Sequence, residues 1–242
     1  MVLFGDCLDL LNDVPDGSVD MVLCDPPFGS TNCRWDSPID LTRLWAHYRR
    51  VVKPNGAILL FGQTPFDKVL GVSNLPWLRY EWIWEKTQPT GHLNAKKMPM
   101  KAHENILVFY DKLPTYNPQK TTGHPRKVST AHHKRNSKVT DVYGKHEKTG
   151  YDSTERYPRD VLVFASDKQK VALHETQKPL ALCEYLIKTY TNEGDLVLDN
   201  CAGSGTVGLA AINTNRRFIL MENDPHYFGV IGERLPPLPT HV

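Results

Sequence analysis

An acid, two prolines and an aromatic ring follow directly on an apolar run, as Asp25, Pro26, Pro27 and Phe28. The run, Val19–Cys24, is predicted to be a buried strand, so the acid is expected just past its carboxyl end, where open α/β sheets bind ligands. Prolines fix φ and donate no backbone hydrogen bond, which leaves the Asp25 carboxylate and nearby carbonyls as rigid acceptors beside an aromatic face. Such a group suits an exocyclic amine whose heterocycle stacks on Phe28. A simple strand-ending turn is the alternative.

A second apolar run, Leu196–Asp199, leads into a glycine-rich turn and a predicted helix. The turn comprises Ala202, Gly203, Ser204, Gly205 and Thr206. Glycines let a backbone approach a ligand closely, and an acid ending the next predicted strand, Glu222 with Asn223 beside it, suits ribose hydroxyls. Dinucleotide-binding oxidoreductases share this pattern and remain an alternative. Asp199 favours a cofactor with a cationic amino-acid end, because a carboxylate there attracts an ammonium and repels a pyrophosphate.

Two shorter segments are candidates for the same ligand. After the predicted strand Val2–Phe4, the Asp6 carboxylate can accept from an adenine amino group and the Cys7 amide can donate to a ring nitrogen. Asp6 would also serve as a helix cap. The second segment is a polar loop of Thr176, Gln177, Lys178 and Pro179. It enters a predicted helix with its proline near the first turn, so on its own it would be an ordinary helix start.

As a set, these segments resemble the motifs of the β class of DNA amino-methyltransferases that use S-adenosylmethionine. In that class the acid-proline-proline-aromatic motif precedes the glycine-rich motif, which is the order found here. The resemblance covers nearly the whole chain apart from one basic segment. It implies that residues 25–28 are catalytic, that the loop at 176–179 lies against the methionine end of the cofactor, and that the glycine turn holds the rest of it.

The resemblance also implies a reaction. A methyl group would pass from S-adenosylmethionine to the N6 amino group of adenine in double-stranded DNA, by direct in-line attack of a flipped-out base. Transfer to cytosine N4 is the same chemistry and stays open, although families with that activity tend to carry serine where Asp25 stands. Cytosine C5 transfer would require a nucleophilic cysteine in a Pro-Cys setting, and no such dipeptide occurs.

The elements that must position these residues alternate between strands and helices. This pattern predicts an α/β fold with a mostly parallel, doubly wound sheet, and the resemblance implies that it is a Rossmann-like methyltransferase fold in permuted order. Leu78–Glu85 and Glu104–Tyr110 are expected to pair as an antiparallel hairpin at the sheet edge. We expect residues 1–110 to form the catalytic half, residues 111–160 a small basic target-recognition insert, and residues 161–242 the cofactor-binding half.

Positive charge is concentrated in the predicted insert. Between Asn117 and Lys148 there are eight Lys or Arg against two acids, whereas the whole chain carries a net charge of only +2. A basic segment on a near-neutral body is typical of a protein that contacts a polyanion. Three groups of residues are therefore predicted to contact DNA: Arg34 and Trp35 in the loop after Phe28, Lys96, Lys97 and Lys101 in the hairpin loop, and Lys134, Arg135 and Lys138 in the insert.

Composition narrows the class of protein further. The 242 residues are 40% hydrophobic and 23% charged, and no apolar run approaches the ~20 residues of a membrane span, so a cytoplasmic location is expected. Five scattered cysteines, never spaced as Cys-x-x-Cys, indicate neither a disulfide framework nor a metal site. The expected partner is double-stranded DNA, with the protein as a monomer or a homodimer.

Overall fold

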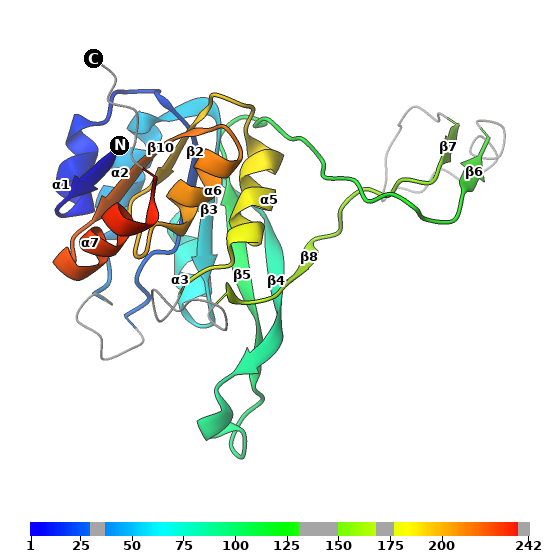
Figure 1. Cartoon of the computed structure of the whole chain (residues 1–242), viewed down its shortest axis with the longest axis horizontal. Coiled ribbons are helices and arrows are strands. Elements are labelled where there is room, and N and C mark those ends of the chain that lie inside the picture. Colours follow the sequence, from blue (N-terminus) through cyan, green and yellow to red (C-terminus); the bar gives the residue numbers. More distant parts are fainter. Residues whose placement is uncertain (30–36, 131–149, 168–176, 237–242) are drawn as a thin grey trace. The chain divides into compact units, whose positions relative to one another are not determined.

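The computed structural model describes residues 1–29, 37–130, 150–167 and 177–236. They form two compact units, one of Met1–Asn117 with Asp160–Val242, and one of Pro118–Arg159. The larger unit is built on an eight-stranded sheet (Figure 1). Its strands follow the order β1 (Val2–Phe4), β10 (Arg217–Glu222), β9 (Leu196–Asp199), β2 (Val19–Cys24), β3 (Val52–Gly62), β5 (Lys101–Phe109), β4 (Leu78–Thr90) and β8 (Val161–Phe164).

All pairings in this sheet are parallel except those of β5, which runs antiparallel to both β3 and β4. The predicted fold class is therefore confirmed. The predicted hairpin forms, but β8 pairs in parallel with β4 and takes the edge position outside it. Leu162 of β8 is buried while Val161 and Val163 are exposed, so this edge strand packs on one face only.

Helices cover both faces of the sheet. They are α1 (Cys7–Leu10), α2 (Leu41–Val51), α3 (Phe66–Ser73), α5 (Leu180–Tyr190), α6 (Thr206–Asn213) and α7 (Pro225–Arg234), with the 3₁₀ turns η1 (Leu11–Asp13) and η2 (His92–Asn94). Alternate residues of β2 enter two separate cores: Met21 packs in a core that also holds residues of α5, α6 and α7, and Val22 in one that holds residues of α1, α2 and α3. The sheet is thus doubly wound, as the sequence pattern predicts.

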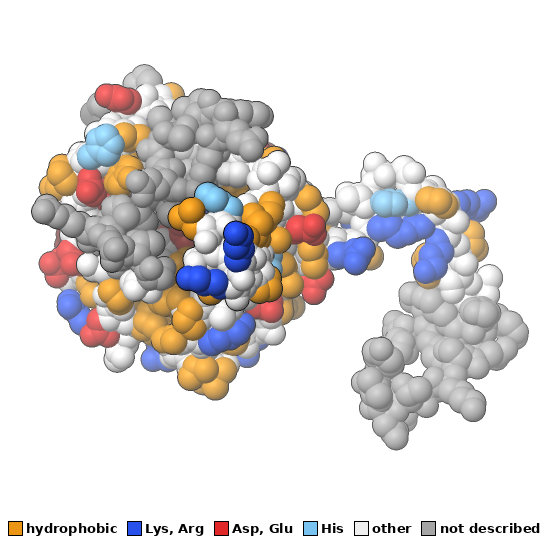
Figure 2. Space-filling view, turned by 90° about the horizontal axis from the view of Figure 1, so that it is seen from below, with side chains coloured by type: hydrophobic (Ala, Val, Ile, Leu, Met, Phe, Trp, Pro, Cys, Tyr) orange, Lys and Arg blue, Asp and Glu red, His pale blue; other side chains and the backbone are white. Residues whose placement is uncertain are grey.

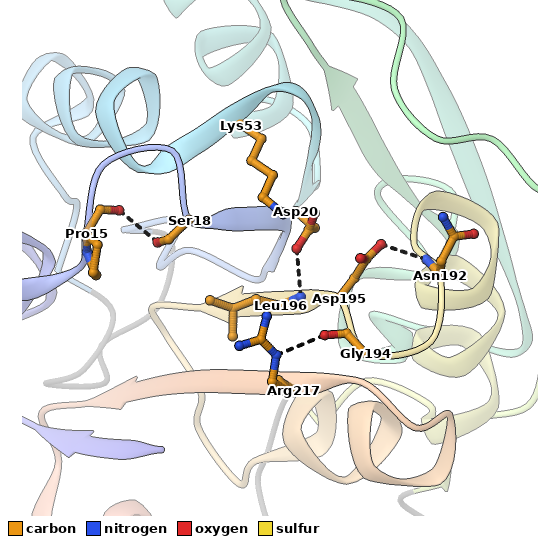
Figure 3. Close-up of polar contacts among 9 residues, drawn as sticks. All are labelled: Pro15, Ser18, Asp20, Lys53, Asn192, Gly194, Asp195, Leu196 and Arg217. Carbon is orange, nitrogen blue, oxygen red and sulfur yellow. Dashed lines mark hydrogen bonds and ion pairs between the residues drawn. The ribbon is translucent and has the colours of Figure 1, made fainter.

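A polar network fixes the edge of the sheet where β2, β9 and β10 begin (Figure 3). Asp20 is its centre: one carboxylate oxygen lies 2.6 Å from Lys53 Nζ, and the other accepts from the Leu196 amide at 2.9 Å. Nearby, the Arg217 guanidinium donates to the Gly194 carbonyl at 2.9 Å. These contacts connect the starts of three parallel strands. The carboxyl ends of the same strands are therefore held in a fixed register relative to one another.

The smaller unit, Pro118–Arg159, contains a two-stranded antiparallel sheet of β6 (Lys127–Ser129) and β7 (Tyr151–Ser153). An exposed ion pair joins Arg126 to Asp152 beside this sheet. The insert was predicted to start at residue 111, but residues 111–117 belong to the larger unit, where the Asn117 amide donates to the Thr189 carbonyl at 2.7 Å. No helix in the described ranges is long and apolar enough to cross a membrane.

Candidate active site

A cavity of about 780 Å³ lies at the carboxyl ends of the parallel strands of the larger unit. Most of the residues predicted to bind a ligand line it, from both sequence motifs. These are Asp6, Cys7, Asp25, Pro26, Pro27, Phe28, Gln177, Lys178, Asp199, Ala202, Gly203, Ser204, Thr206, Glu222 and Asn223. Pro179 and Gly205 do not line the cavity, and Thr176 lies outside the described residues. The two motifs, distant in sequence, therefore face one space.

Strand register explains why the acids of the two motifs meet. Val22 of β2 pairs with Leu198 of β9, so Asp25 follows just beyond the level of Asp199. Asp199 is only 3% exposed, and burial raises its pKa to about 7, with the neighbouring charges of Asp25 and Glu222 acting in the same direction. The raised pKa shows that the protein groups around Asp199 compensate its negative charge poorly, so the site favours a cationic ligand group.

The glycine turn is braced from the last helix. Gly205 has φ +74°, a conformation that favours glycine, and an added Cβ would lie 3.1 Å from the Ile231 side chain of α7. Arg234 of α7 donates to the carbonyl and hydroxyl oxygens of Ser204, each at 2.9 Å, and to Thr206 Oγ1 at 2.8 Å. The bracing arginine was not predicted from the sequence, because it lies 28 to 30 residues beyond the turn.

Glu222 is held by backbone donors at the end of β10. Its Oε2 accepts from the Gly203 amide at 2.7 Å, and its Oε1 accepts from the amides of Asn223 and Asp224 at 3.0 and 2.8 Å. Burial nevertheless raises its pKa. A carboxylate offers about four acceptor positions, so three amide donors fix the orientation of Glu222 and leave acceptor capacity for a ligand hydroxyl. Asp6, as expected, both caps α1 through the Leu8 amide at 2.8 Å and lines the cavity.

Asp25 is held at one oxygen only. Its Oδ2 lies 2.7 Å from Lys178 Nζ, whereas Oδ1 is shielded from solvent and has no hydrogen-bond partner among the described residues. Burial raises the pKa of Asp25; Lys178 opposes this effect and Glu104 adds to it. A shielded acceptor without a partner costs free energy, so Oδ1 is an acceptor reserved for a donor that the chain itself does not supply.

Lys178 belongs to a buried chain of charges that continues away from Asp25. Its Nζ also lies 2.9 Å from Glu104 Oε2, and Glu104 Oε1 lies 2.6 Å from Lys86 Nζ. Burial would raise the pKa of Glu104, but Lys178 and Lys86 outweigh it and lower that pKa to about 2. Burial likewise would lower the pKa of Lys178, and its two carboxylate partners raise it instead. Lys178 therefore stays a cation between two acids.

Sequence reasoning assigned Lys178 to the cofactor loop and did not single out Glu104 or Lys86. The structure joins Lys178 to the predicted catalytic motif through Asp25, a contact between segments about 150 residues apart in the chain. Glu104 had a local indication: with Asn105 it leads into the apolar run Ile106–Phe109 of β5, and a charge so close to a buried run is rarely buried without a partner.

Aromatic rings line the cavity around these charges. The Phe28 ring stacks on Phe66 with centroids 4.9 Å apart and planes at 26°, and Phe28 itself lines the cavity. Trp84 lines it too, although it is only 3% exposed and donates its indole N–H to the Phe164 carbonyl at 2.9 Å. The cavity thus combines a shielded acceptor with flat apolar walls, which suits a planar heterocycle carrying an amine.

The residues predicted to contact DNA are divided between described and undescribed parts of the chain. Lys96, Lys97 and Lys101 are exposed in the β4–β5 hairpin. Gln88 and Thr90 of the same hairpin line the cavity, so these lysines belong to the arm that borders it. Arg34, Trp35, Lys134, Arg135 and Lys138 lie outside the described residues.

Comparisons with known proteins bear on this arrangement. A family model described as DNA methylase, of the N6 and N4 methyltransferases, matches residues 19–233. The chain is also 28% identical over 255 residues to the Type II methyltransferase M.BglII of Bacillus subtilis. That alignment covers 93% of this chain and 66% of the relative, so the chain spans slightly less than two thirds of the relative's length.

Two solved structures share the fold. The crystal structure of the M1.HpyAVI–SAM complex has a TM-score of 0.66 and 25% identity, covering 97% of this chain and 98% of that one. The PvuII DNA methyltransferase, which is cytosine-N4-specific, has a TM-score of 0.66 and 16% identity, covering 99% of this chain and 87% of that one. The fold and the family expected from the sequence motifs are confirmed together.

Proposed function

Because the chain belongs to the DNA methylase family of N6 and N4 methyltransferases, we propose that it transfers a methyl group from S-adenosylmethionine to the N6 amino group of adenine in double-stranded DNA. One observation carries the proposal. Asp25, whose shielded Oδ1 has no hydrogen-bond partner in the described part of the chain, lines the same cavity as the buried carboxylate of Asp199 and the glycine turn. The cavity therefore offers an acceptor for an amine, at Asp25, and a negative charge to pair with a cationic cofactor, at Asp199.

The cavity fits the proposed cofactor at three points. Asp199 would pair with the ammonium of the methionine end, because its pKa of about 7 marks a carboxylate that lacks a compensating cation. Glu222 would accept from the ribose hydroxyls, and its orientation is already fixed by amide donors. Asp6, at the end of β1, would accept from the adenine amino group of the cofactor. The volume of about 780 Å³ also leaves room for a second ring.

The second ring is the target base, and Asp25 is the group that would act on it. S-adenosylmethionine supplies a methyl group on a positively charged sulfur. Asp25 Oδ1 and a carbonyl beside Pro26 would accept the two hydrogens of the amine, which draws the nitrogen towards a tetrahedral shape and frees its lone pair for in-line attack. The new N–C bond forms as the C–S bond breaks, and the amine then loses one proton. Asp25, as the hydrogen-bond acceptor of the amine, would lie beside that proton, and its raised pKa makes it a better base for it.

The finer assignment to adenine rests on the residue type at position 25. An aspartate there, rather than a serine, favours N6 of adenine over N4 of cytosine. The alternative has its own support, since a cytosine-N4-specific enzyme shares the fold. The reaction, the cofactor geometry and Asp25 would serve either target.

The test is direct. The purified protein is incubated with S-adenosylmethionine labelled in its methyl group and mixed-sequence duplex DNA, and the DNA is digested to nucleosides. Recovery of N6-methyladenine would support the proposal. Recovery of N4-methylcytosine would instead identify cytosine as the target base and leave the proposed methyl-transfer chemistry unchanged. Binding of NADH without methyl transfer would overturn the assignment in favour of an oxidoreductase.

The same assay tests Asp25. Asp25→Asn keeps the size of the side chain but removes the charge and the proton acceptor, so we expect a rate loss of at least about 100-fold with cofactor affinity largely unchanged. The matched control is Asp16→Asn, which alters an exposed carboxylate that pairs with Arg50 and does not line the cavity, and it should keep most of the rate. An Asp25→Asn variant with near-normal turnover would refute the role of Asp25.

A further inference from the structure

The β4–β5 hairpin continues past the body of the sheet as an arm, defined here as residues 87–103 (Figure 1). At its tip, η2 (His92–Asn94) follows Gly91, whose φ of +89° makes the turn. The tip carries apolar side chains that touch little else: Leu93 is 87% exposed, Met98 53% and Met100 38%. Together these three side chains form an exposed apolar group on the arm, and an exposed apolar group rimmed by polar residues marks a site of interaction.

The arm rises from the rim of the cavity. Gln88 and Thr90 of the arm line the cavity together with Asp25, and Lys86 and Glu104 at its base belong to the charge chain that holds Lys178. Leu93 lies three positions after Thr90 in the chain, which corresponds to a reach of at most about 10 Å beyond the rim. Leu93 is therefore within reach of whatever polymer delivers a base into the cavity.

The charge of the arm points to one class of partner. No acid occurs between Glu85 and Glu104, whereas Lys96, Lys97 and Lys101 are exposed there with His92 and His103. Figure 2 shows lysine, histidine and hydrophobic side chains gathered where the hairpin points at the viewer. An apolar tip ringed by cations matches a DNA duplex, in which phosphates flank an apolar stack of bases.

We propose that the arm is a DNA wedge: Leu93 enters the base stack at the place that the flipped target base leaves, and Lys96 and Lys97 contact the flanking phosphates. The inference rests on the proposed function and adds to it the group that keeps the duplex open. Flipping a base costs stacking and pairing energy, and an inserted apolar side chain recovers part of that cost because it is buried against the neighbouring bases.

The test compares two substrates that carry the same methylated site, once it has been mapped. One is a fully paired duplex, and in the other the target base faces an abasic position. Leu93→Ala should lower kcat/KM on the paired duplex by about 10- to 100-fold, which corresponds to the loss of one buried leucine side chain. The loss should largely disappear on the unpaired substrate, since no pairing has to be broken. In the paired duplex, 2-aminopurine at the target position should fluoresce less with the variant.

Two further variants control the comparison. Leu113→Ala removes another exposed leucine, which follows the end of β5 on the side of the sheet away from the cavity. This variant should leave kcat/KM unchanged on both substrates. The double variant Lys96→Ala, Lys97→Ala should weaken the binding of both substrates alike. It should also lower the slope of log K for DNA binding against log salt concentration by about two.

The wedge would be overturned if Leu93→Ala lowered kcat/KM equally on both substrates, or on neither. It would also be overturned if the protein formed a concentration-dependent dimer that the substitution abolished while methylation stayed unchanged. Failure of the wild-type protein to methylate either substrate would instead overturn the proposed function.

Discussion

Replacing Asp199 by asparagine should stabilise the empty protein while it weakens the cofactor site. Burial raises the pKa of Asp199 from 3.8 to about 7, so the folded state holds its proton more tightly than the unfolded state does. The stabilising contribution is therefore fully present below about pH 4 and is lost as the pH rises towards 7. Linkage gives a loss of about 3 kcal/mol between pH 5 and pH 8 from this one group. Asparagine keeps the acceptor for the Cys201 amide, at 3.1 Å in the native protein, and has no charge to desolvate.

The assay is urea unfolding of both proteins at pH 5 and pH 8 without ligand. The difference in unfolding free energy between Asp199→Asn and wild type should grow by about 3 kcal/mol over that range, because other titrating groups cancel in the comparison. Leu113→Ala, which removes an exposed side chain that does not titrate, is the control, and its difference from wild type should lack this growth. A difference between Asp199→Asn and wild type that stays constant with pH would refute the reasoning that burial strains this carboxylate.

Binding gives the second half of the same prediction. If the ionised carboxylate pairs with the cofactor ammonium, the wild-type Kd for S-adenosylmethionine should rise about tenfold for each pH unit below 7 and level off above it. Asp199→Asn should bind about 10- to 100-fold more weakly at pH 8, the value of a hydrogen bond to a charged group, and lose the pH dependence. Calorimetric titrations at several pH values measure both. Equal affinity of the two proteins at pH 8 would assign the ammonium to another partner.

Two more predictions concern charge. Glu104→Gln should destabilise the protein by about 3–5 kcal/mol, because two buried lysines lose their shared carboxylate. Since Glu104 raises the pKa of Asp25, its removal should also shift the acid limb of the pH–rate profile to lower pH, which loss of stability alone would not do; an unshifted limb contradicts the link. In the insert, neutralising three cations should lower the salt slope of DNA binding by about one for each lost phosphate contact, and an unchanged slope would leave them as solvated surface. These three are Lys134, Arg135 and Lys138.

Local patterns were enough to predict the strands and the acids that end them. β2 spans Val19–Cys24 as expected, and Asp199 and Glu222 close β9 and β10, because apolar runs of strand length with polar ends leave few alternatives. Element ends set by tertiary contacts were not predictable. Helix α1 stops at Leu10 and tightens into η1, and β4 runs on to Thr90, well past its expected end at Glu85.

Contacts between side chains far apart in the sequence could not be predicted either, because they also depend on tertiary packing. Nothing near Lys178 in the sequence indicates that it pairs with Asp25 and Glu104, since those contacts exist only after the sheet has assembled. Arg234 was likewise invisible, because its three bonds to Ser204 and Thr206 depend on how α7 packs. The sequence identified which residue types would meet a ligand, and packing decided which groups support them.

The order of the two motifs in the chain has no bearing on the site. Asp25 and Asp199 are 174 positions apart, yet their strands β2 and β9 are direct neighbours, with Met21 opposite Val197. The proposed chemistry requires two parallel strands whose carboxyl ends lie side by side, so that the acids following them converge. The hydrogen-bonded register of neighbouring parallel strands provides this whichever strand comes first in the sequence. A chain in which the strand before the glycine turn preceded the strand before Asp25 could build the same cavity, so the site's geometry depends on which strands are neighbours and not on their order in the sequence.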